Sequence, residues 1–182
     1  METDKLQPVF LWAPKLSGVH CDPVTEFDKS LAELVAQCIQ TMHYYGGVGL
    51  AAAQIGKFVR VAVAEHEDKR VVLINPELSS LTGNETGFEG CLSLPGVTAS
   101  GTRIHNGGRL ARCTDIEYFT HTLTGKRVKK EAHGFMARVI QHEIDHMSGI
   151  FVVDRMSAMY RSIVMRNFEN FKKQIQDGAV PV

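Results

Sequence analysis

The clearest hydrophobic period in the chain lies between Thr25 and the glycine pair at 46–47. Apolar side chains recur there every three or four residues, a spacing that places them on one face of a helix. Asp28 follows Thr25 by three residues, the position that completes a capping box. We therefore predict a helix that begins at Thr25 and ends at the glycine pair. Its apolar face consists of Phe27, Leu31, Leu34, Val35, Cys38, Ile39 and Met42.

The middle of the chain carries short apolar or alternating runs bounded by turn residues, a pattern typical of strands. Strands are predicted at 58–64, 71–74, 86–98, 109–119 and 126–130. The last two runs would form a long hairpin around Thr124-Gly125, and 86–98 would lead from a strand into a turn. Residues 1–24, which contain three prolines, are expected to form an extended arm with turns.

Helical periodicity returns in the last third of the chain. One helix is predicted over 132–147, with Gly149 just past its end. A final helix should follow Ser157 and stop before Gly178. Its apolar face would consist of Tyr160, Ile163, Val164, Phe168, Phe171 and Ile175. Because strands occupy the middle and helices both ends, we predict a single α+β domain over 1–182 with mostly antiparallel pairing.

Composition and charge exclude several classes of protein. The 182 residues are 44% apolar and 22% charged, as expected for a soluble globular domain. Lysine plus arginine and aspartate plus glutamate both total 20, so the formal net charge is zero. Nucleic-acid binders normally carry an excess of basic residues, because neutralising phosphates supplies most of their non-specific affinity. We therefore expect no nucleic-acid recognition.

The sequence also indicates where the protein works. No apolar run approaches the ~18 residues of a membrane span, and the opening METDKLQPVF resembles neither a signal nor a transit peptide. The four cysteines are scattered without a CxxC pair, which favours free thiols in a reducing compartment. We expect a cytoplasmic protein without membrane contact, or an organellar one if a eukaryotic transit peptide has been removed.

The strongest chemical signal is the HExxH pattern at 142–146. Side chains four residues apart lie on one face of a helix, so His142 and His146 can bind one divalent metal. A metal lowers the pKa of a coordinated water toward about 7, and Glu143 can take its proton and return it to the leaving group. The alternative is an amphipathic helix whose histidines are surface or capping residues. The apolar residues just before the pattern indicate a helical context, which favours the metal-binding interpretation over surface histidines.

The pattern leaves the third metal ligand open. A longer protease pattern, HExxHxxGxxH, has its glycine at Gly149 but Val152 in place of its third histidine. Glu169, in the last predicted helix, could complete a His₂Glu site, although a solvated surface position is the interpretation we favour. Cys91, directly after Gly90, is the other candidate, because a thiolate binds Zn²⁺ or Fe²⁺ well. A single cysteine in a strand is, however, more often a small buried residue.

A segment rich in glycine and alanine, GGVGLAAAQ at 46–54, follows the first predicted helix. Its glycine spacing does not match a phosphate loop, and no Lys-Ser/Thr pair follows. One interpretation is a tightly packed turn after the helix. The other is a backbone edge along which a peptide can lie, with Gln54 as a neutral hydrogen-bond donor.

Three segments in order, GVGLAAAQ at 47–54, EGCLS at 89–93 and QHEIDH at 141–146, resemble the signature motifs of the peptide deformylase family. The similarity extends to PKLSGVHCDPV before the first helix and to LINPEL after the second strand. It implies antiparallel sheets packed around a central HExxH-bearing helix, with a helix near each end of the chain. It also implies an enzyme that removes the formyl group from the N-terminal formylmethionine of newly made polypeptides and releases formate.

The resemblance further implies a role for each motif residue. Cys91, His142 and His146 would hold one divalent metal, Fe²⁺ in the cell and also Zn²⁺, Ni²⁺ or Co²⁺ in preparations. Glu143 would act as general base and then acid, and the Gln54 side chain with the Leu92 backbone N–H would form an oxyanion hole. The substrate-binding positions would be Gly47, Val48, Gly49, Gly90, Phe135 and Val139. Val48, Phe135 and Val139 would line a methionine pocket, with the peptide added as a strand beside 46–49.

The sequence departs from the common family pattern between Val97 and Gly125. Thr98 stands where many members carry an arginine, and only Arg103 matches a later Val-Pro-Arg segment. The hairpin that follows is also longer than usual. The expected partners are formylated nascent peptides, with transient ribosome association. Asp145 either orients part of the site or forms a surface salt bridge.

Two other functions remain possible at this point. One is a zinc endopeptidase that uses Glu169 in place of Cys91. The other is a non-catalytic protein that keeps a structural metal or binds peptide termini, against which the intact Glu143 argues. The remaining histidines and two of the cysteines are expected to have no chemical role: His20, His43, His66, His105, His121, His133, Cys21 and Cys113.

Overall fold

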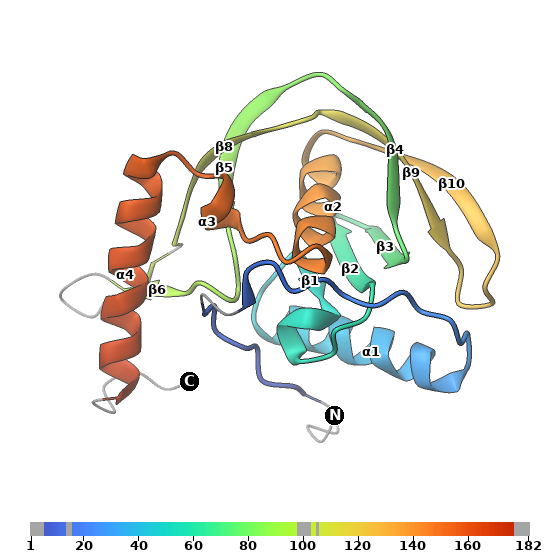
Figure 1. The fold of residues 1–182 in the computed structure, drawn as a ribbon, viewed down its shortest axis with the longest axis horizontal. Helices are drawn as coiled ribbons and strands as arrows, with labels where there is room; N and C mark the ends of the chain where they lie inside the picture. The colour runs from blue at the N-terminus through green and yellow to red at the C-terminus, as the bar shows by residue number, and fades with distance from the viewer. Residues whose placement is uncertain (1–5, 14–15, 98–102, 105, 177–182) are drawn as a thin grey trace.

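The computed structural model describes residues 6–13, 16–97, 103–104 and 106–176 (Figure 1). Its elements, in chain order, are α1 Lys29–Tyr44, β1 Gly49–Ala51, the 3₁₀ helix η3 Ala52–Ile55, β2 Val61–His66, β3 Lys69–Ile74, β4 Glu77–Thr82, β5 Glu85–Gly90, β6 Gly96–Val97, β7 Arg103–Ile104, β8 Gly107–Arg112, β9 Asp115–His121, β10 Arg127–His133, α2 Gly134–Met147, α3 Val152–Arg155 and α4 Ala158–Gln176. Thr98, His105 and Gly178, singled out in the sequence, lie outside the described residues.

The strands form small antiparallel sheets. Two have three strands, in the orders β1-β2-β3 and β10-β9-β4, and two are the pairs β5-β8 and β6-β7. Every ladder between these named strands is antiparallel. The segments from β4 to β5 and from β8 to β9 run together in an arch over α2 (Figure 1). The predicted α+β class, antiparallel pairing and terminal helices are confirmed.

Helix α1 begins later than the sequence predicts. Asp28 is extended (φ −119°, ψ −168°), and its carboxylate accepts hydrogen bonds from the backbone N–H groups of Ser30 and Leu31 at 2.9 and 3.2 Å. Asp28 is therefore the N-cap itself, and the predicted start at Thr25 is wrong. The buried face runs from Leu31 to Met42 and includes Cys38, which is fully buried as expected.

The predicted strand 109–119 is two strands. The chain leaves the β5-β8 ladder at Cys113 and enters the β9-β10 ladder at Asp115. Gln141 of α2 accepts from the Cys113 N–H at 3.2 Å and donates to its carbonyl at 2.8 Å, so a side chain satisfies both backbone groups at the break. The hairpin turn around Gly125 (φ 81°) is confirmed.

Helix α2 also begins later than predicted. Residues 132–133 belong to β10, where Ala132 pairs with Ile116 and His133 with Asp115. The chain turns into the helix at Gly134, whose φ of 53° lies in the region that favours glycine. The helix then ends at Met147, followed by Gly149 at φ 68°, as the sequence predicts.

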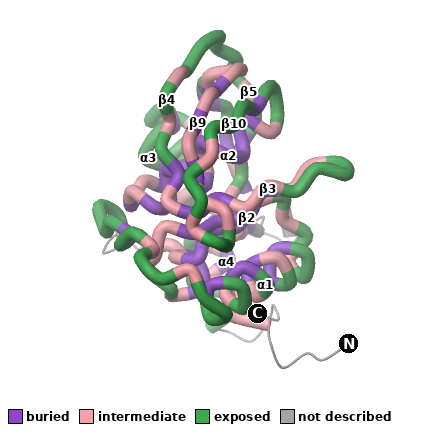
Figure 2. The backbone as a smooth tube through the Cα atoms, turned by 90° about the vertical axis from the view of Figure 1, so that its right-hand side faces the viewer, coloured by how far each residue is buried: buried purple, intermediate pink, exposed green. Residues whose placement is uncertain are grey.

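Buried residues gather along α2, and the tube is largely purple where Figure 2 labels this helix. The helix packs mainly against β1, β2, β9 and β10. Helix α4 lies against β6 and β8 and buries Val164, Phe168 and Phe171. Ile163, predicted on the same face, is instead exposed. Successive residues of a helix point about 100° apart, so Ile163 points away from the direction in which its neighbour Val164 is buried. None of the helices in the described ranges is both long and apolar enough to cross a membrane.

Candidate functional site

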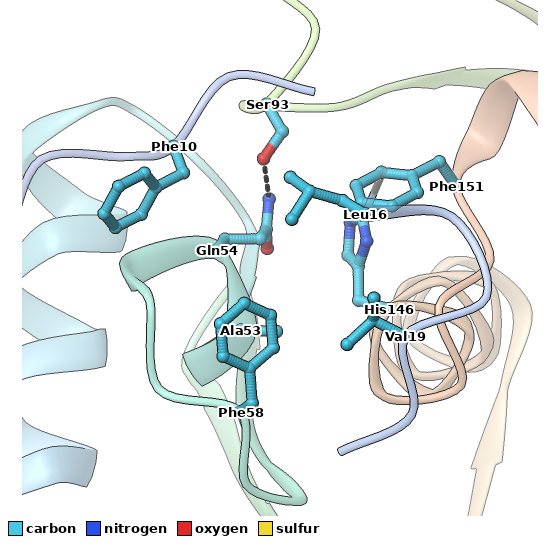
Figure 3. A pocket seen from close by; sticks show the side chains of 9 residues that line it. All are labelled: Phe10, Leu16, Val19, Ala53, Gln54, Phe58, Ser93, His146 and Phe151. Atoms are coloured by element: carbon cyan, nitrogen blue, oxygen red, sulfur yellow. Dashed lines mark hydrogen bonds between the residues drawn. The ribbon is translucent and has the colours of Figure 1, made fainter. Parts of the chain in front are cut away.

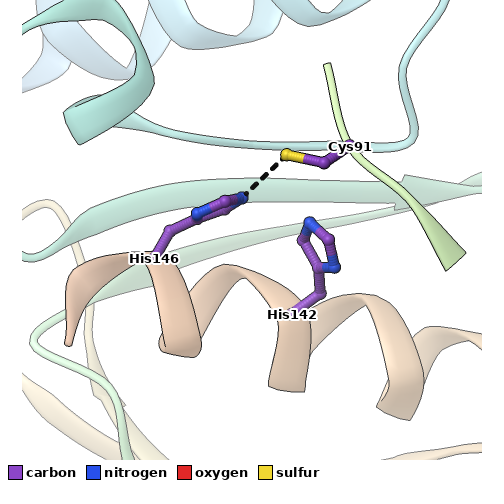
Figure 4. A group of neighbouring side chains, drawn as sticks. All are labelled: Cys91, His142 and His146. Atoms are coloured by element: carbon purple, nitrogen blue, oxygen red, sulfur yellow. Dashed lines mark hydrogen bonds between the residues drawn. The ribbon is translucent and has the colours of Figure 1, made fainter. Parts of the chain in front are cut away.

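Two distant segments bring three metal-ligand side chains together. His142 and His146 project from successive turns of α2, and Cys91 comes directly after β5 (Figure 4). Their ligand atoms all lie within 4.8 Å of one another, and Cys91 Sγ is 3.3 Å from His146 Nε2. A thiolate with two imidazoles is a donor set that Zn²⁺ and Fe²⁺ accept. Three protein ligands leave a position for water or substrate, so the set fits a catalytic metal.

Glu169 is not part of this cluster. It lies on α4, where its carboxylate pairs with Lys172 at 2.7 Å, and half of its side chain is exposed (51%). The surface position favoured from the sequence is therefore confirmed. Of the two candidates for the third ligand, the structure brings Cys91 and not Glu169 beside the histidines.

The two histidines differ in their protonation chemistry. Burial lowers the pKa of His146 well below its usual range, which keeps the ring in the neutral form that binds metal. Burial opposes the charge of His142 as well, but hydrogen bonds to Cys91 and Glu89 outweigh it and raise the pKa of His142. Metal binding would therefore displace a proton from His142.

Glu89 is a residue of the site for which sequence analysis gave no role. It is buried, and its Oε2 lies 3.0 Å from Nδ1 of His142, which leaves Nε2 of that ring for the metal. Arg112 of β8 donates to both carboxylate oxygens at 3.0 Å. Burial opposes ionisation of Glu89, but its bonds to His142 and Arg112 lower its pKa to about 2. The sequence offers one signal for Glu89, which is that it opens the EGCLS segment that contains Cys91.

Asp145 belongs to the same buried network. Asp145 is 8% exposed, and its carboxylate accepts from Arg112 at 2.5 Å and from Arg155 of α3. The alternative of a surface salt bridge is wrong, because Asp145 joins α2 to β8 and α3 from inside the protein. Through Arg112 it is connected to Glu89 and, one step further, to His142.

Glu143 is buried next to the β1 backbone. It is 3% exposed, and within the described residues its Oε2 has no hydrogen-bond partner. Burial is the main cause that raises the pKa of Glu143 to about 7. A carboxylate with a free oxygen and a pKa close to neutral can both accept and return a proton at physiological pH.

The amide of Gln54 is held in one orientation (Figure 3). Its Oε1 accepts from the Ala51 N–H at 2.9 Å, and its Nε2 donates to Ser93 Oγ at 3.1 Å. Nε2 also lies 3.6 Å from Cys91 Sγ, so the amide N–H₂ faces the metal cluster. Leu92 follows Cys91 directly, and its side chain packs against the backbone of Gly47.

The substrate-binding residues named from the sequence are partly brought together. β1 is an edge strand, because its sheet runs β1-β2-β3, and Val48 beside it is 44% exposed. Val139 is buried against Gly49. Phe135 is exposed and its ring lies 4.6 Å from that of His66. Gly90 is different, since its backbone pairs with Gly107 of β8 and lies in a strand ladder.

Gly49 offers a direct test of the contact between β1 and Glu143. A Cβ at this position would lie 2.3 Å from Glu143 Oε1 and 2.9 Å from Val139 Cγ1, so the carboxylate would have to move. Misplacing a reacting group by about 1 Å can lower the rate by about 10²-fold. We expect Gly49→Ala to lower kcat/KM by about 10²-fold in steady-state assays, while its metal content stays unchanged. Undiminished kcat/KM would show that Glu143 has no fixed position in the reaction.

The residues expected to have no chemical role stay apart from the cluster. His43 pairs with Glu65 at 3.2 Å and His133 with Asp115 at 2.7 Å, both near the surface. Cys21 is buried and Cys113 half-buried, both as free thiols. In the described parts of the chain none of them joins Cys91 and the two histidines.

Comparison with known proteins gives one consistent result. The profile of the family described as polypeptide deformylase matches residues 12–162. The chain is 40% identical over 132 residues to a peptide deformylase of Dictyoglomus thermophilum, covering 72% of this chain and 80% of that protein. It is 38% identical over 150 residues to peptide deformylase 1 of Bacillus subtilis, covering 81% and 88%. A crystal structure of a peptide deformylase from Legionella pneumophila superposes with a TM-score of 0.84 at 30% identity, covering 97% and 99%.

Proposed function

The chain belongs to the polypeptide deformylase family, and with that as the premise we propose a role for each residue of its site. The protein is a metal-dependent hydrolase that removes the N-formyl group from newly made polypeptides.

Cys91, His142 and His146 hold one divalent metal. The observation that carries this assignment is that their ligand atoms lie within 4.8 Å of one another. Cys91 is 51 residues (142 − 91) before His142 in the sequence, so the fold brings distant segments together. When bound, the metal lowers the pKa of a coordinated water toward about 7 and polarises the formyl carbonyl. We assign Fe²⁺ as the metal in the cell, with Zn²⁺, Ni²⁺ or Co²⁺ able to replace it.

Metal analysis tests the identity of the ion. Protein purified without oxygen from cells grown in unsupplemented medium should contain about one iron per chain, since three protein ligands define one catalytic site. Full occupancy by zinc in such a preparation, with unchanged activity when iron is added back, would contradict the assignment of Fe²⁺. Neither result bears on Cys91, His142 and His146 as ligands.

Glu143 moves the proton. It takes a proton from the attacking water and delivers it to the amine nitrogen that leaves as formate is released. The support is its unpartnered Oε2, its burial and its pKa of about 7. A group with that pKa is present in both protonation states near neutral pH.

Gln54 and Leu92 stabilise the oxygen that becomes negative during attack. The Gln54 amide and the Leu92 backbone N–H both donate to this oxygen, and donors held in place before the substrate arrives need no reorganisation during attack. The support for Gln54 is its orientation, fixed by Ala51 and Ser93. The support for Leu92 is its place next to Cys91 and its packing against Gly47.

Replacing Gln54 by alanine should lower kcat by about 10²- to 10³-fold, the usual loss for one oxyanion donor. Metal content should be unchanged, because Gln54 is not a ligand. The rate of formate release by the metal-loaded protein measures the effect. Gln40→Ala, on the exposed side of α1, is the control and should keep full activity. A Gln54→Ala enzyme within a factor of three of the wild type would remove Gln54 from the oxyanion hole.

The formylated peptide lies along β1 as an added strand. The free edge of β1 and the exposure of Val48 support this placement. The methionine side chain is bound between Val48, Phe135 and Val139, and the lack of side chains at Gly47 and Gly49 lets the backbone approach.

The remaining assignments concern the protein as a whole. We take 1–182 as one catalytic domain with α2 as its central helix. Its substrates are formylated nascent chains met during transient contact with the ribosome, in the cytoplasm or in an organelle that makes its own proteins. The zero formal net charge supports the absence of nucleic-acid recognition.

A further inference from the structure

Arg138 is a buried arginine to which the mechanism so far assigns no role. It lies on α2, one turn before His142, and is 7% exposed. Its Nη1 donates to Oε1 of Glu89 at 2.9 Å and to the Leu110 carbonyl at 3.2 Å. Its Nη2 donates to the Glu85 carbonyl at 2.7 Å. A buried guanidinium needs hydrogen-bond acceptors, and here both terminal nitrogens donate to one or more.

These bonds join the two halves of the metal site. The histidines are on α2, whereas Cys91 is delivered by β5, and α2 has its main packing contacts with other strands. Arg138 reaches β5 at its first residue, Glu85, and again at Glu89, two residues before Cys91. The separation between α2 and the end of β5 is therefore set in part by this one side chain.

The strand is shaped to receive the guanidinium. Gly87 lies midway between the two points on β5 that Arg138 contacts. A Cβ on Gly87 would lie 2.9 Å from both Cζ and Nη2 of Arg138, closer than real Cβ contacts. Glycine at this position therefore leaves the space that the guanidinium occupies, and a larger residue would displace it.

Arg138 and Arg112 hold Glu89 from different elements. Arg112 fixes the carboxylate to β8, and Arg138 fixes it to the helix that carries His142. With His142 Nδ1 on Oε2, both oxygens of Glu89 are fully engaged. Loss of Arg138 would leave Glu89 bound to Arg112 of β8 and to His142 alone on α2. The carboxylate would lose its second anchor on that helix, so the His142 ring would lose part of its fixed direction.

We propose that Arg138 is a positioning residue for the metal centre, which sets the distance from α2 to β5 and, through Glu89, the direction of the His142 ring. The inference rests on the proposed assignment of Cys91, His142 and His146 as the metal ligands. It makes Arg138 a determinant of metal affinity without being a ligand.

Metal binding by Arg138→Met and Arg138→Lys tests the inference. Competition with a chelator gives the Kd for Zn²⁺, and the absorption spectrum of the Co²⁺-loaded protein reports ligand geometry. We expect Arg138→Met to weaken Zn²⁺ binding about 10- to 100-fold, the usual effect of a group behind a ligand, and to change the Co²⁺ spectrum. Lysine supplies a point charge but cannot span the same acceptors, so Arg138→Lys should lie between Arg138→Met and the wild type.

Two further variants separate positioning from simple loss of stability. Leu31→Ala removes buried apolar volume from α1, away from the site, and should lower stability without changing Zn²⁺ affinity or the Co²⁺ spectrum. Gly87→Ala keeps Arg138 but forces it from β5, and should shift the Co²⁺ spectrum in the same direction as Arg138→Met. If Arg138→Met does not fold, Arg138→Lys and Gly87→Ala carry the test.

The outcomes distinguish this inference from the proposed function. Wild-type affinity and spectrum in Arg138→Lys and Gly87→Ala, and in Arg138→Met where it folds, would overturn the role of Arg138 and leave the ligands intact. A wild-type protein that binds neither Zn²⁺ nor Co²⁺ at one per chain would overturn the ligand assignment, and the inference with it.

Discussion

Replacing Glu143 by glutamine is expected to lower kcat for formate release by about 10²- to 10⁴-fold, the usual contribution of a general acid–base group. Glutamine fills the same space beside Gly49 and Val139, so the packing around β1 is kept. It cannot accept a proton from water, which removes the function assigned to the unpartnered Oε2. Metal content should equal that of the wild type, because Glu143 is not a ligand.

The matched control is Glu169→Gln. Glu169 is a half-exposed glutamate on α4 that pairs with Lys172, and its replacement should change neither activity nor metal content. Parallel measurements of formate release and metal stoichiometry on both variants separate loss of the base from loss of the site. If Glu143→Gln kept a tenth or more of the wild-type rate with metal in place, another group would have to be the base.

Replacing Cys91 by alanine should remove both metal and activity. Groups behind a ligand affect metal affinity by about 10- to 100-fold, and loss of a ligand should exceed that range. Two imidazoles would remain, without the sulfur of Cys91 that lies 3.3 Å from His146 Nε2. Equilibrium dialysis against Zn²⁺ measures the affinity, and formate release measures the activity.

Cys113→Ala is the control for Cys91. Cys113 is also a free, half-buried thiol but stands at the break between β8 and β9. Its replacement should leave one metal per chain and full activity. Retention of tight Zn²⁺ binding by Cys91→Ala would contradict the site.

Part of the site follows from local sequence pattern. The helical period ahead of 142–146 places His142 and His146 on one face, and the structure has them on successive turns of α2. The sequence also indicates that Asp28 takes part in the cap of α1, but as the residue three positions after a start at Thr25, whereas Asp28 is itself the N-cap. These features depend on neighbours within one turn of helix, which a sequence displays directly.

Other features depend on contacts that a sequence does not display. β1 has three small or apolar residues, and β4 is largely polar and exposed, so neither shows a strand period. The break between β8 and β9 is fixed by Gln141 from a different element. Residue type also misleads for Arg138 and Arg112, because arginine is usually exposed, and their burial follows from carboxylates and carbonyls of distant segments.

The most direct test of the proposed function is formate release from a formyl-methionyl tripeptide. The protein is purified without oxygen, loaded with Fe²⁺ or Ni²⁺, and assayed beside Glu143→Gln under the same conditions. We expect rapid release by the wild type that is nearly absent in the variant. No release by a wild-type protein that holds one metal per chain would contradict it.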